Sequence, residues 1–205
     1  MSEIAENLLI KPREFFREKV SHAISNQKLK VSEDVEFYLV NLLCDFISPL
    51  AIEDLGEKDI LEIPLAEIFK LALESPPEKQ VKIYKILGDT SLYVSGYFQD
   101  YFNRKTYDID YYITLGSTAY SSVSDLMKSK KSSQNHFSGV YSHLSKNFHN
   151  LVEVVAEVSD LLGTPGNENL LAIYDRWTKN KSERLKRKLE NSGISPIDVN
   201  TKVTQ

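Results

Sequence analysis

Apolar side chains recur along most of this chain at intervals of three and four residues, which is the spacing of one face of an α-helix. The first such stripe consists of Phe16, Val20, Ala23 and Ile24. Pro12 precedes this stripe and suits a first helical turn, because a proline lacks the N–H that would be unpaired there anyway. These positions predict a helix over 12–27.

A second helix is predicted over 33–47, and it is apolar on more than one side. Ser32 suits the N-cap, and Glu33 and Asp34 follow in the first turn, where the helix dipole stabilises negative charge. One apolar stripe is Val35, Leu39, Leu42 and Phe46, and the other is Phe37, Val40, Leu43, Cys44 and Ile47. A helix that is apolar nearly all round lies in the centre of a core or in a subunit interface.

The middle of the chain predicts short helices over 52–61 and 64–73 and then two long ones. Ser75 and Glu78 have the spacing of a capping box at the start of a helix over 76–103. Its stripe is Tyr84, Gly88, Ser91, Ser95, Phe98 and Phe102, and the stripe of the next helix, over 107–128, is Ile109, Tyr112, Gly116, Ala119, Val123 and Leu126. A glycine inside a helix costs about 1 kcal/mol relative to alanine, so we expect either a tight helix crossing or a ligand cavity here.

The most regular pattern follows a polar loop at 128–134. Phe137, Tyr141, Leu144, Phe148, Leu151, Val155, Val158 and Leu162 alternate spacings of four and three, as in helix bundles and coiled coils. This predicts one continuous helix that stops at the segment 163–166. Asn167 suits the N-cap of a last helix through Asn191, with Leu170, Tyr174, Trp177, Leu185 and Leu189 toward the core.

The predicted fold class is all-α. No segment shows the strict alternation of a half-buried strand, and no internal repeat is present. Eight glycines and seven prolines are too few for the many turns of a sandwich or barrel. The sequence therefore predicts an irregular bundle of six or seven helices in a single domain over 1–191, followed by a flexible C-terminal tail over 192–205.

The composition and the net charge bear on the cellular compartment and on the kinds of partner. A single cysteine, Cys44, forms no internal disulfide, and we interpret it as a small buried hydrophobe. The N-terminus lacks the features of a secretory signal, and no run of about 18 apolar residues is present, so we expect a soluble cytoplasmic protein without a membrane partner. The net charge of −4 argues against a general affinity for nucleic acid.

The charges are unevenly distributed. Residues 31–67 hold ten acidic and one basic side chain, and residues 179–190 hold six basic and two acidic ones, for net charges of −9 and +4. Such poles can steer a partner or attract each other within one fold. Aromatic side chains do not interleave with the C-terminal basic run, so the spacing does not suggest a base-stacking surface.

The candidate ligand or interface residues are Asp89, Ser91, Tyr93, Tyr97, Tyr112 and Tyr120. They lie in the region where eight of the eleven tyrosines are crowded, and tyrosine favours half-buried sites, interfaces and ligand walls. Tight packing with the hydroxyl groups in water is the alternative interpretation.

No motif predicts catalysis, a metal or a cofactor. The glycines of 88–96 lack the clustering of a phosphate loop, and Asp108 and Asp110 are two residues apart, so on a helix they do not converge on one substrate. The histidines do not have the spacing of a helical metal site: they are His22, His136, His143 and His149. The sequence therefore favours a protein that is not an enzyme.

Two segments of the central third resemble a pattern in uncharacterised bacterial helical proteins. They are Gly88-Asp89-x-Ser91-Leu92-Tyr93-x-x-Gly96-Tyr97-Phe98 and Tyr111-Tyr112-Ile113-x-Leu115-Gly116-x-x-Ala119-Tyr120. The resemblance implies a bacterial source and a helical fold, and it implies no activity.

Three functions are open. The leading hypothesis is a helical protein–protein interaction or regulatory module, expected to form a homodimer or to bind another protein. The second is a small-molecule sensor or enzyme with a pocket between the helices 76–103 and 107–128. The third, weaker hypothesis is nucleic-acid binding through the basic segments 128–131 and 179–188.

Overall fold

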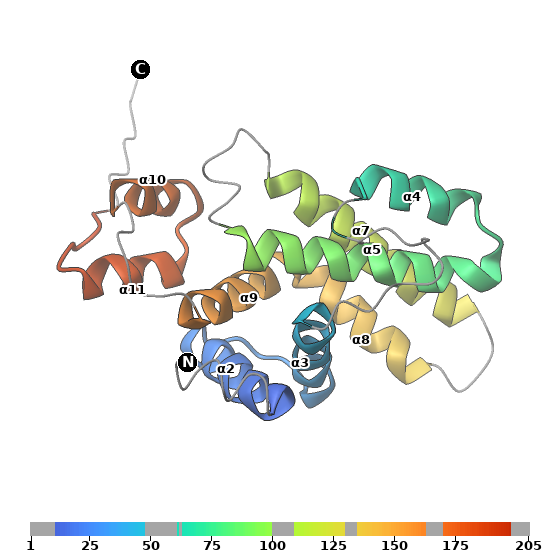
Figure 1. Ribbon diagram of the computed structural model, residues 1–205, viewed down its shortest axis with the longest axis horizontal. Helices are drawn as coiled ribbons and strands as arrows, with labels where there is room; N and C mark the ends of the chain where they lie inside the picture. Colours follow the sequence, from blue (N-terminus) through green and yellow to red (C-terminus); the bar gives the residue numbers. More distant parts are fainter. Residues whose placement is uncertain are drawn as a thin grey trace, which may run out of the picture. The chain divides into compact units, whose positions relative to one another are not determined.

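The computed structural model describes residues 11–47, 61, 63–99, 109–129, 135–162 and 170–197 (Figure 1). Within these ranges the structure is helical and contains no strand, which confirms the predicted all-α class. The chain divides into two compact units, Met1–Leu162 and Gly163–Gln205, and each is described by itself below. The single domain over 1–191 stays a prediction.

The described part of the first unit contains seven helices: α2 (Pro12–Asn26), α3 (Glu33–Ile47), α4 (Leu65–Glu74), α5 (Pro77–Tyr97), α7 (Ile109–Ser129), α8 (Asn135–Lys146) and α9 (Phe148–Leu162). Helix α5 packs against α4, α7 and α9, while α2 packs against α3 and α9, and α8 packs against α7. The second unit holds α10 (Leu170–Asn180) and α11 (Glu183–Asn191). The described ranges thus contain nine helices instead of six or seven, because two helices expected to be continuous are broken.

The first break divides the heptad helix at Asn147. The backbone N–H of Asn147 makes the regular helical bond to the carbonyl of His143 at 3.0 Å, and the side-chain amide of Asn147 donates to the same carbonyl at 3.1 Å. An asparagine that bonds to the nearby backbone in this way competes with the regular helical pattern. The apolar stripe nevertheless continues across the break, since Leu144, Phe148 and Leu151 are all buried. The heptad pattern therefore predicted the buried face correctly and the continuity of the helix wrongly.

The second break separates α10 from α11 at Lys181. This residue has a positive φ of 52°, a backbone conformation that costs a side-chain-bearing residue about 1–2 kcal/mol. Its N–H closes α10 by bonding to the carbonyl of Trp177 at 2.8 Å, and its ammonium lies 4.4 Å from the centre of the Trp177 ring. The cation–π contact partly offsets the backbone strain, and the turn folds α11 back toward α10.

Helix starts agree with the sequence in two cases and differ in a third. Helix α2 begins at Pro12, and the hydroxyl of Ser32 accepts the N–H of Val35 at 3.4 Å, as expected of an N-cap. The capping box at Ser75 and Glu78 is wrong. Helix α5 takes Pro76 as its N-cap and makes no side-chain cap hydrogen bond, because the helix begins one residue later than the serine pattern requires.

The core of the first unit is centred on α9 rather than on α3. Every residue from Leu151 to Val158 is buried. Helix α3 buries Leu39 and Leu43 but leaves Phe37 62% exposed. Val40 and Leu43 belong to the same stripe as Phe37 and are 5% and 1% exposed, so both apolar stripes of the 33–47 helix face the core. Among the described large apolar side chains of this helix, Phe37 is the one that is available to a partner.

The second unit is a small helical hairpin. Its core consists of Ile173, Trp177, Leu185 and Leu189. Helix α11 ends at Asn191, and the φ of 80° at Gly193 allows the N–H of Ile194 to reach the carbonyl of Leu189 at 2.9 Å. Ile194 then packs on the core, so the chain stays attached beyond residue 192, where the tail was expected to begin.

Several predictions fall outside the described residues. They are the short helix over 52–60, the end of the 76–103 helix beyond residue 99, the loop at 130–134, the stop at 163–166, the N-cap Asn167 and the tail beyond residue 197.

Candidate functional site

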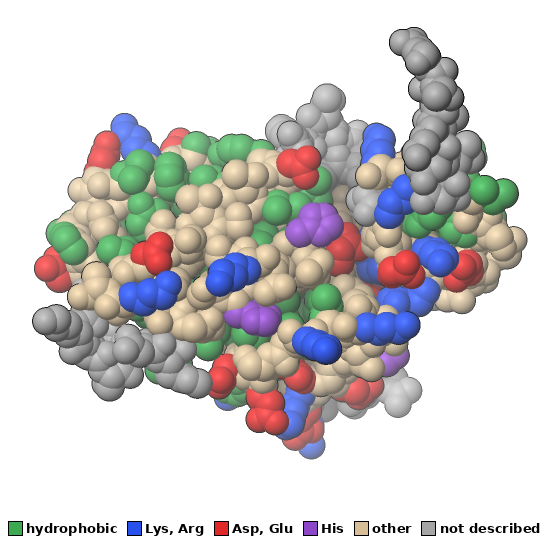
Figure 2. Space-filling view, turned by 180° about the vertical axis from the view of Figure 1, so that it is seen from behind, with side chains coloured by type: hydrophobic (Ala, Val, Ile, Leu, Met, Phe, Trp, Pro, Cys, Tyr) green, Lys and Arg blue, Asp and Glu red, His purple; other side chains and the backbone are tan. Residues whose placement is uncertain are grey.

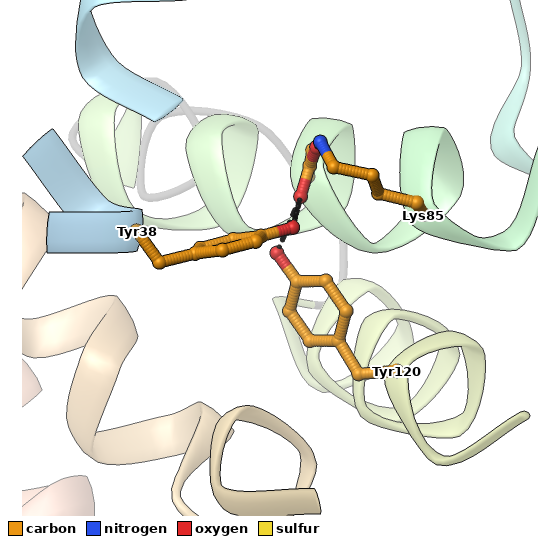
Figure 3. A network of polar contacts seen from close by, with 4 residues as sticks. Tyr38, Lys85 and Tyr120 are labelled. Atoms are coloured by element: carbon orange, nitrogen blue, oxygen red, sulfur yellow. Dashed lines mark hydrogen bonds and ion pairs between the residues drawn. The ribbon is translucent and has the colours of Figure 1, made fainter. Parts of the chain in front are cut away.

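A polar cluster surrounds the carboxylate of Asp89 on α5, between helices of the first unit (Figure 3). Oxygen Oδ1 accepts the hydroxyl of Tyr38 at 2.5 Å and the hydroxyl of Tyr120 at 2.8 Å. Oxygen Oδ2 accepts the ammonium of Lys85, one helical turn earlier, at 2.5 Å. The donors come from α3, α7 and α5, so one carboxylate joins three helices. We call Tyr38, Lys85, Asp89 and Tyr120 the tyrosine–aspartate cluster.

A fourth helix adds an aromatic wall to this cluster. The ring of Tyr141, on α8, lies 5.6 Å from that of Tyr38 and 5.9 Å from that of Tyr120. The Tyr38 and Tyr120 rings meet edge to face at 6.0 Å. Edge-to-face contacts of this kind stabilise aromatic pairs beyond the area that they bury. The three rings therefore form an aromatic wall of the cluster, and the ammonium of Lys85 lies 5.4 Å from the centre of the Tyr38 ring.

Burial and charge fix the protonation of the donors. Desolvation, reinforced by the Asp89 charge, raises the pKa of Tyr38 and the pKa of Tyr120 well above the ordinary value, so both hydroxyls stay neutral donors. Desolvation alone lowers the pKa of Lys85, but the attraction of Asp89 outweighs it and the pKa is raised. Lys85 is the solvent-facing member, with 41% of its side chain exposed compared with 13% for Asp89.

Asp45, near the C-terminal end of α3, lies at the margin of the cluster. Desolvation raises the pKa of its carboxyl group, Lys85 lowers it, and Asp89 raises it again.

Glycine makes the cluster possible, because it allows the helices to approach closely. A Cβ on Gly88 would lie 2.5 Å from the ring of Tyr120. A Cβ on Gly116 would lie 2.3 Å from the ring of Phe148 and 2.7 Å from the Cβ of Ser91. A Cβ on Gly96 would lie 2.6 Å from the side chain of Val155. Of the two expectations for the small-residue stripes, the structure therefore favours tight crossings at these three glycines.

Serine hydroxyls also link neighbouring helices, by donating hydrogen bonds to backbone carbonyl groups. Ser91 on α5 donates to the carbonyl of Tyr112 on α7 at 2.5 Å. Ser159 on α9 donates to the carbonyl of Tyr97 at 2.8 Å. On the other side, Ser124 of α7 donates to the carbonyl of Ser138 on α8 at 2.9 Å. These three hydroxyls thus find partners in the backbone, as expected of polar groups removed from water.

Tyr93 and Tyr97 belong to a separate aromatic group. The Tyr93 ring stacks on Phe46 of α3 at 4.1 Å and on Tyr97 at 5.0 Å, with interplanar angles of 4° and 16°. Phe98 meets both tyrosines edge-on and is 40% exposed. Burial raises the pKa of Tyr93 to about 12, so this hydroxyl also stays protonated at neutral pH.

The six sequence candidates therefore divide into three groups rather than one site. Asp89 and Tyr120 share the tyrosine–aspartate cluster. Tyr93 stacks on both Phe46 and Tyr97, and the hydroxyl of Ser91 donates to the backbone carbonyl of Tyr112. Sequence reasoning missed three neighbours of the cluster: Tyr38, Lys85 and Tyr141. The contact of Lys85 with Asp89 could have been predicted from the sequence, because Lys85 precedes Asp89 by four residues and lies on the same helix face. The tyrosines of α3 and α8 had none.

The cluster offers little unused chemistry. A carboxylate has about four lone-pair positions, and three of those on Asp89 already accept donors. A general base needs an accessible lone pair within reach of a substrate proton. The geometry suits a structural link between helices better than a proton-transfer site.

Other sequence candidates give no further site in the described residues. No three His, Cys, Asp or Glu side chains gather as a metal ion would require, and histidines lie apart on the face shown in Figure 2. Cys44 is half-buried, and burial raises the pKa of its thiol, which disfavours a reactive thiolate. Asp108 lies outside the described residues, and Asp110 is exposed in the first turn of α7.

None of the described helices is long and apolar enough to cross a membrane. Comparison of the chain with protein-family models, with curated proteins and with solved structures found no match, so the resemblance of its central third to bacterial helical proteins stays a prediction.

Proposed function

We propose that this chain is a non-enzymatic helical module that binds another protein, and that the outward face of α3 is its contact surface. One observation carries the proposal: the polar groups of the tyrosine–aspartate cluster point at one another. The carboxylate, ammonium and hydroxyl groups of this cluster are therefore used to hold helices together. A partner of the first unit would therefore contact exposed residues on its surface rather than this cluster.

The outward side of helix α3 presents one large aromatic side chain beside acidic ones. Phe37 is 62% exposed, and it follows the exposed acidic residues Glu33 and Asp34. Aromatic side chains are enriched in the centres of interfaces, where they bury a large area for few rotatable bonds. A single exposed aromatic residue is common on protein surfaces, so the test below is directed at Phe37 itself.

Charge indicates the kind of partner. Helix α3 carries Glu33, Asp34, Glu36 and Asp45 and no basic residue. Two copies of this face would bring like charges together, which opposes a symmetric α3–α3 contact. A neutral or basic surface of another protein fits better. The homodimer expected from the sequence stays a prediction, and it would have to use a different face.

The alternative of a ligand pocket between α5 and α7 has less support. The side chains of Tyr120 and Phe148 already occupy the space beside Gly88 and Gly116, and the hydroxyl of Ser91 is bonded to the backbone of α7. No observation at this crossing favours a bound small molecule.

The proposal is tested with three immobilised proteins: the wild type, Phe37→Ser and Phe137→Ser. Phe137 is 59% exposed on α8 and serves as the matched control. We expect the wild type and the control to retain the same partner protein, and Phe37→Ser to lose it while keeping the wild-type thermal midpoint. Equal retention by Phe37→Ser, or a bare mass of 23.4 kDa in native mass spectrometry with no captured protein, would contradict the proposal.

A further inference from the structure

The second unit combines the two most exposed apolar side chains with a dense set of cations. Leu171 is 77% exposed and Ile197 is 69% exposed, the highest values among the large hydrophobic residues that the structure describes. Residues 170–197 hold seven basic and three acidic side chains, a net charge of +4. Figure 2 shows Lys and Arg side chains beside hydrophobic ones over this hairpin.

The hairpin has little internal stability. Its helices span 11 and 9 residues, shorter than the roughly 12–15 residues at which an isolated helix is marginal in water. Four buried side chains form its core. A unit of this size gains order when an external surface covers its apolar side chains. The exposure of Leu171 and Ile197 is therefore a reason to look for such a surface.

We propose that the α10–α11 hairpin is a docking element for an acidic protein surface that also carries apolar side chains. This inference concerns a different unit from the α3 contact and does not depend on it. Positive charge on the hairpin requires a negative partner, and Leu171 and Ile197 require an apolar one.

Nucleic acid fits the same charge less well. A base-stacking surface needs exposed aromatic rings, whereas Trp177 is 5% exposed and is covered by Lys181. Residues 1–162 hold 17 basic and 24 acidic side chains, a net charge of −7, which repels a phosphate backbone. Exposed leucine and isoleucine side chains also contribute nothing to phosphate contacts.

Trp177 provides the readout, because it is the only tryptophan of the chain and lies in the hairpin core. The full-length protein is titrated with three probes: a synthetic amphipathic peptide of glutamate, leucine and alanine, poly-L-glutamate, and an RNA duplex. We expect the peptide to bind most tightly, to change Trp177 emission, and to lose affinity as salt is added.

Two variants separate the charge from the apolar contact. The triple variant Lys179→Gln, Lys186→Gln, Arg187→Gln should weaken both acidic probes by about tenfold. The matched control Lys70→Gln, Lys79→Gln, Lys146→Gln, which removes three exposed cations from the first unit, should weaken them less than about twofold. Leu171→Ser should weaken the peptide by about tenfold and leave poly-L-glutamate unchanged.

Three results would overturn the proposal. The first is no change in Trp177 emission at low salt with any acidic probe. The second is an equal loss of affinity in the hairpin variant and in the control variant. The third is an RNA duplex that binds as tightly as the peptide, which would make the hairpin a general polyanion site. Far-ultraviolet circular dichroism of each variant ensures that a lost affinity is not a lost fold.

Discussion

Helix α5 is held in two different ways along its length. Around Asp89 it is joined to α3 and α7 by hydrogen bonds from tyrosine hydroxyls, inside a ring of aromatic side chains. Around Gly96 it approaches α9 so closely that an added Cβ would lie 2.6 Å from the side chain of Val155, and the polar contacts beside this crossing include the bond from Ser159 to the carbonyl of Tyr97. Close apolar packing supplies stability, whereas a buried polar cluster requires particular partners in particular positions. The comparison predicts that the two ends respond differently to substitution.

The largest effect is expected at a glycine crossing. Gly116→Val should destabilise the fold by at least about 4 kcal/mol, because both the Phe148 ring and the Cβ of Ser91 would overlap the new side chain. Urea unfolding measures the loss. The matched control is Gly139→Ala on α8, where no atom lies within 4 Å of the added Cβ, and it should stabilise by about 0.5–1 kcal/mol through helix propensity. A tolerated Gly116→Val would contradict the close crossing.

Removal of the central carboxylate should have the next largest effect. Asp89→Ala leaves two buried hydroxyls and the ammonium of Lys85 without their shared acceptor, and we expect a loss of about 3 kcal/mol. Asp125→Ala is the control, since that carboxylate is 70% exposed and its ion pair with Lys128 contributes about 0–1 kcal/mol. Thermal unfolding of the two variants compares a buried with an exposed carboxylate. Equal midpoints would argue against the cluster.

Alkaline pH should weaken the polar end first. Burial raises the pKa of Tyr38 and Tyr120 well above the ordinary value and that of Tyr93 to about 12. A tyrosine in the unfolded chain ionises near pH 10. The contribution of these neutral hydroxyls to the free energy of unfolding is therefore fully present below about pH 10. It is lost as the pH rises through the folded-state pKa values, by up to about 1.4 kcal/mol per pH unit for each hydroxyl. Tyr120→Phe should reduce this slope, measured by unfolding at a series of pH values.

The smallest effect is expected at the solvent side of the cluster. Lys85→Met removes an ammonium that is 41% exposed, so the ion pair with Asp89 is screened and the loss should stay below about 1 kcal/mol. A loss as large as that of Asp89→Ala would mean that the lysine, rather than the tyrosines, holds the carboxylate.

Much of the fold followed from the apolar spacing, and the errors have local causes. The helix starts at Pro12 and Glu33 lie where the sequence predicted them, because proline, capping and first-turn signals are local. The breaks at Asn147 and Lys181 were missed, since neither a side-chain bond to the backbone nor a positive φ changes the three-and-four pattern. The spacing of apolar residues indicates which face of a helix is buried. A one-residue interruption of the helix leaves that spacing nearly unchanged, so it cannot be predicted in this way.

The candidate site was less accessible to sequence reasoning. Asp89 and Tyr120 were identified, but the choice between a cavity and a close crossing depends on which side chain stands opposite each glycine. Tyr120 opposite Gly88 and Phe148 opposite Gly116 are long-range facts that no local pattern contains. Tyr38 lies 51 residues from Asp89 along the chain, so its hydrogen bond could not be read from spacing.

The central claim is that Asp89 and its tyrosines form one cooperative structural link. A double-mutant cycle with Tyr38→Phe, Asp89→Ala and the double variant tests it by urea unfolding. The account predicts a coupling of about 1 kcal/mol, because Tyr38 has little left to lose once its acceptor is gone. Effects that add within about 0.3–0.5 kcal/mol would show that the hydroxyl and the carboxylate act independently, and would contradict the account.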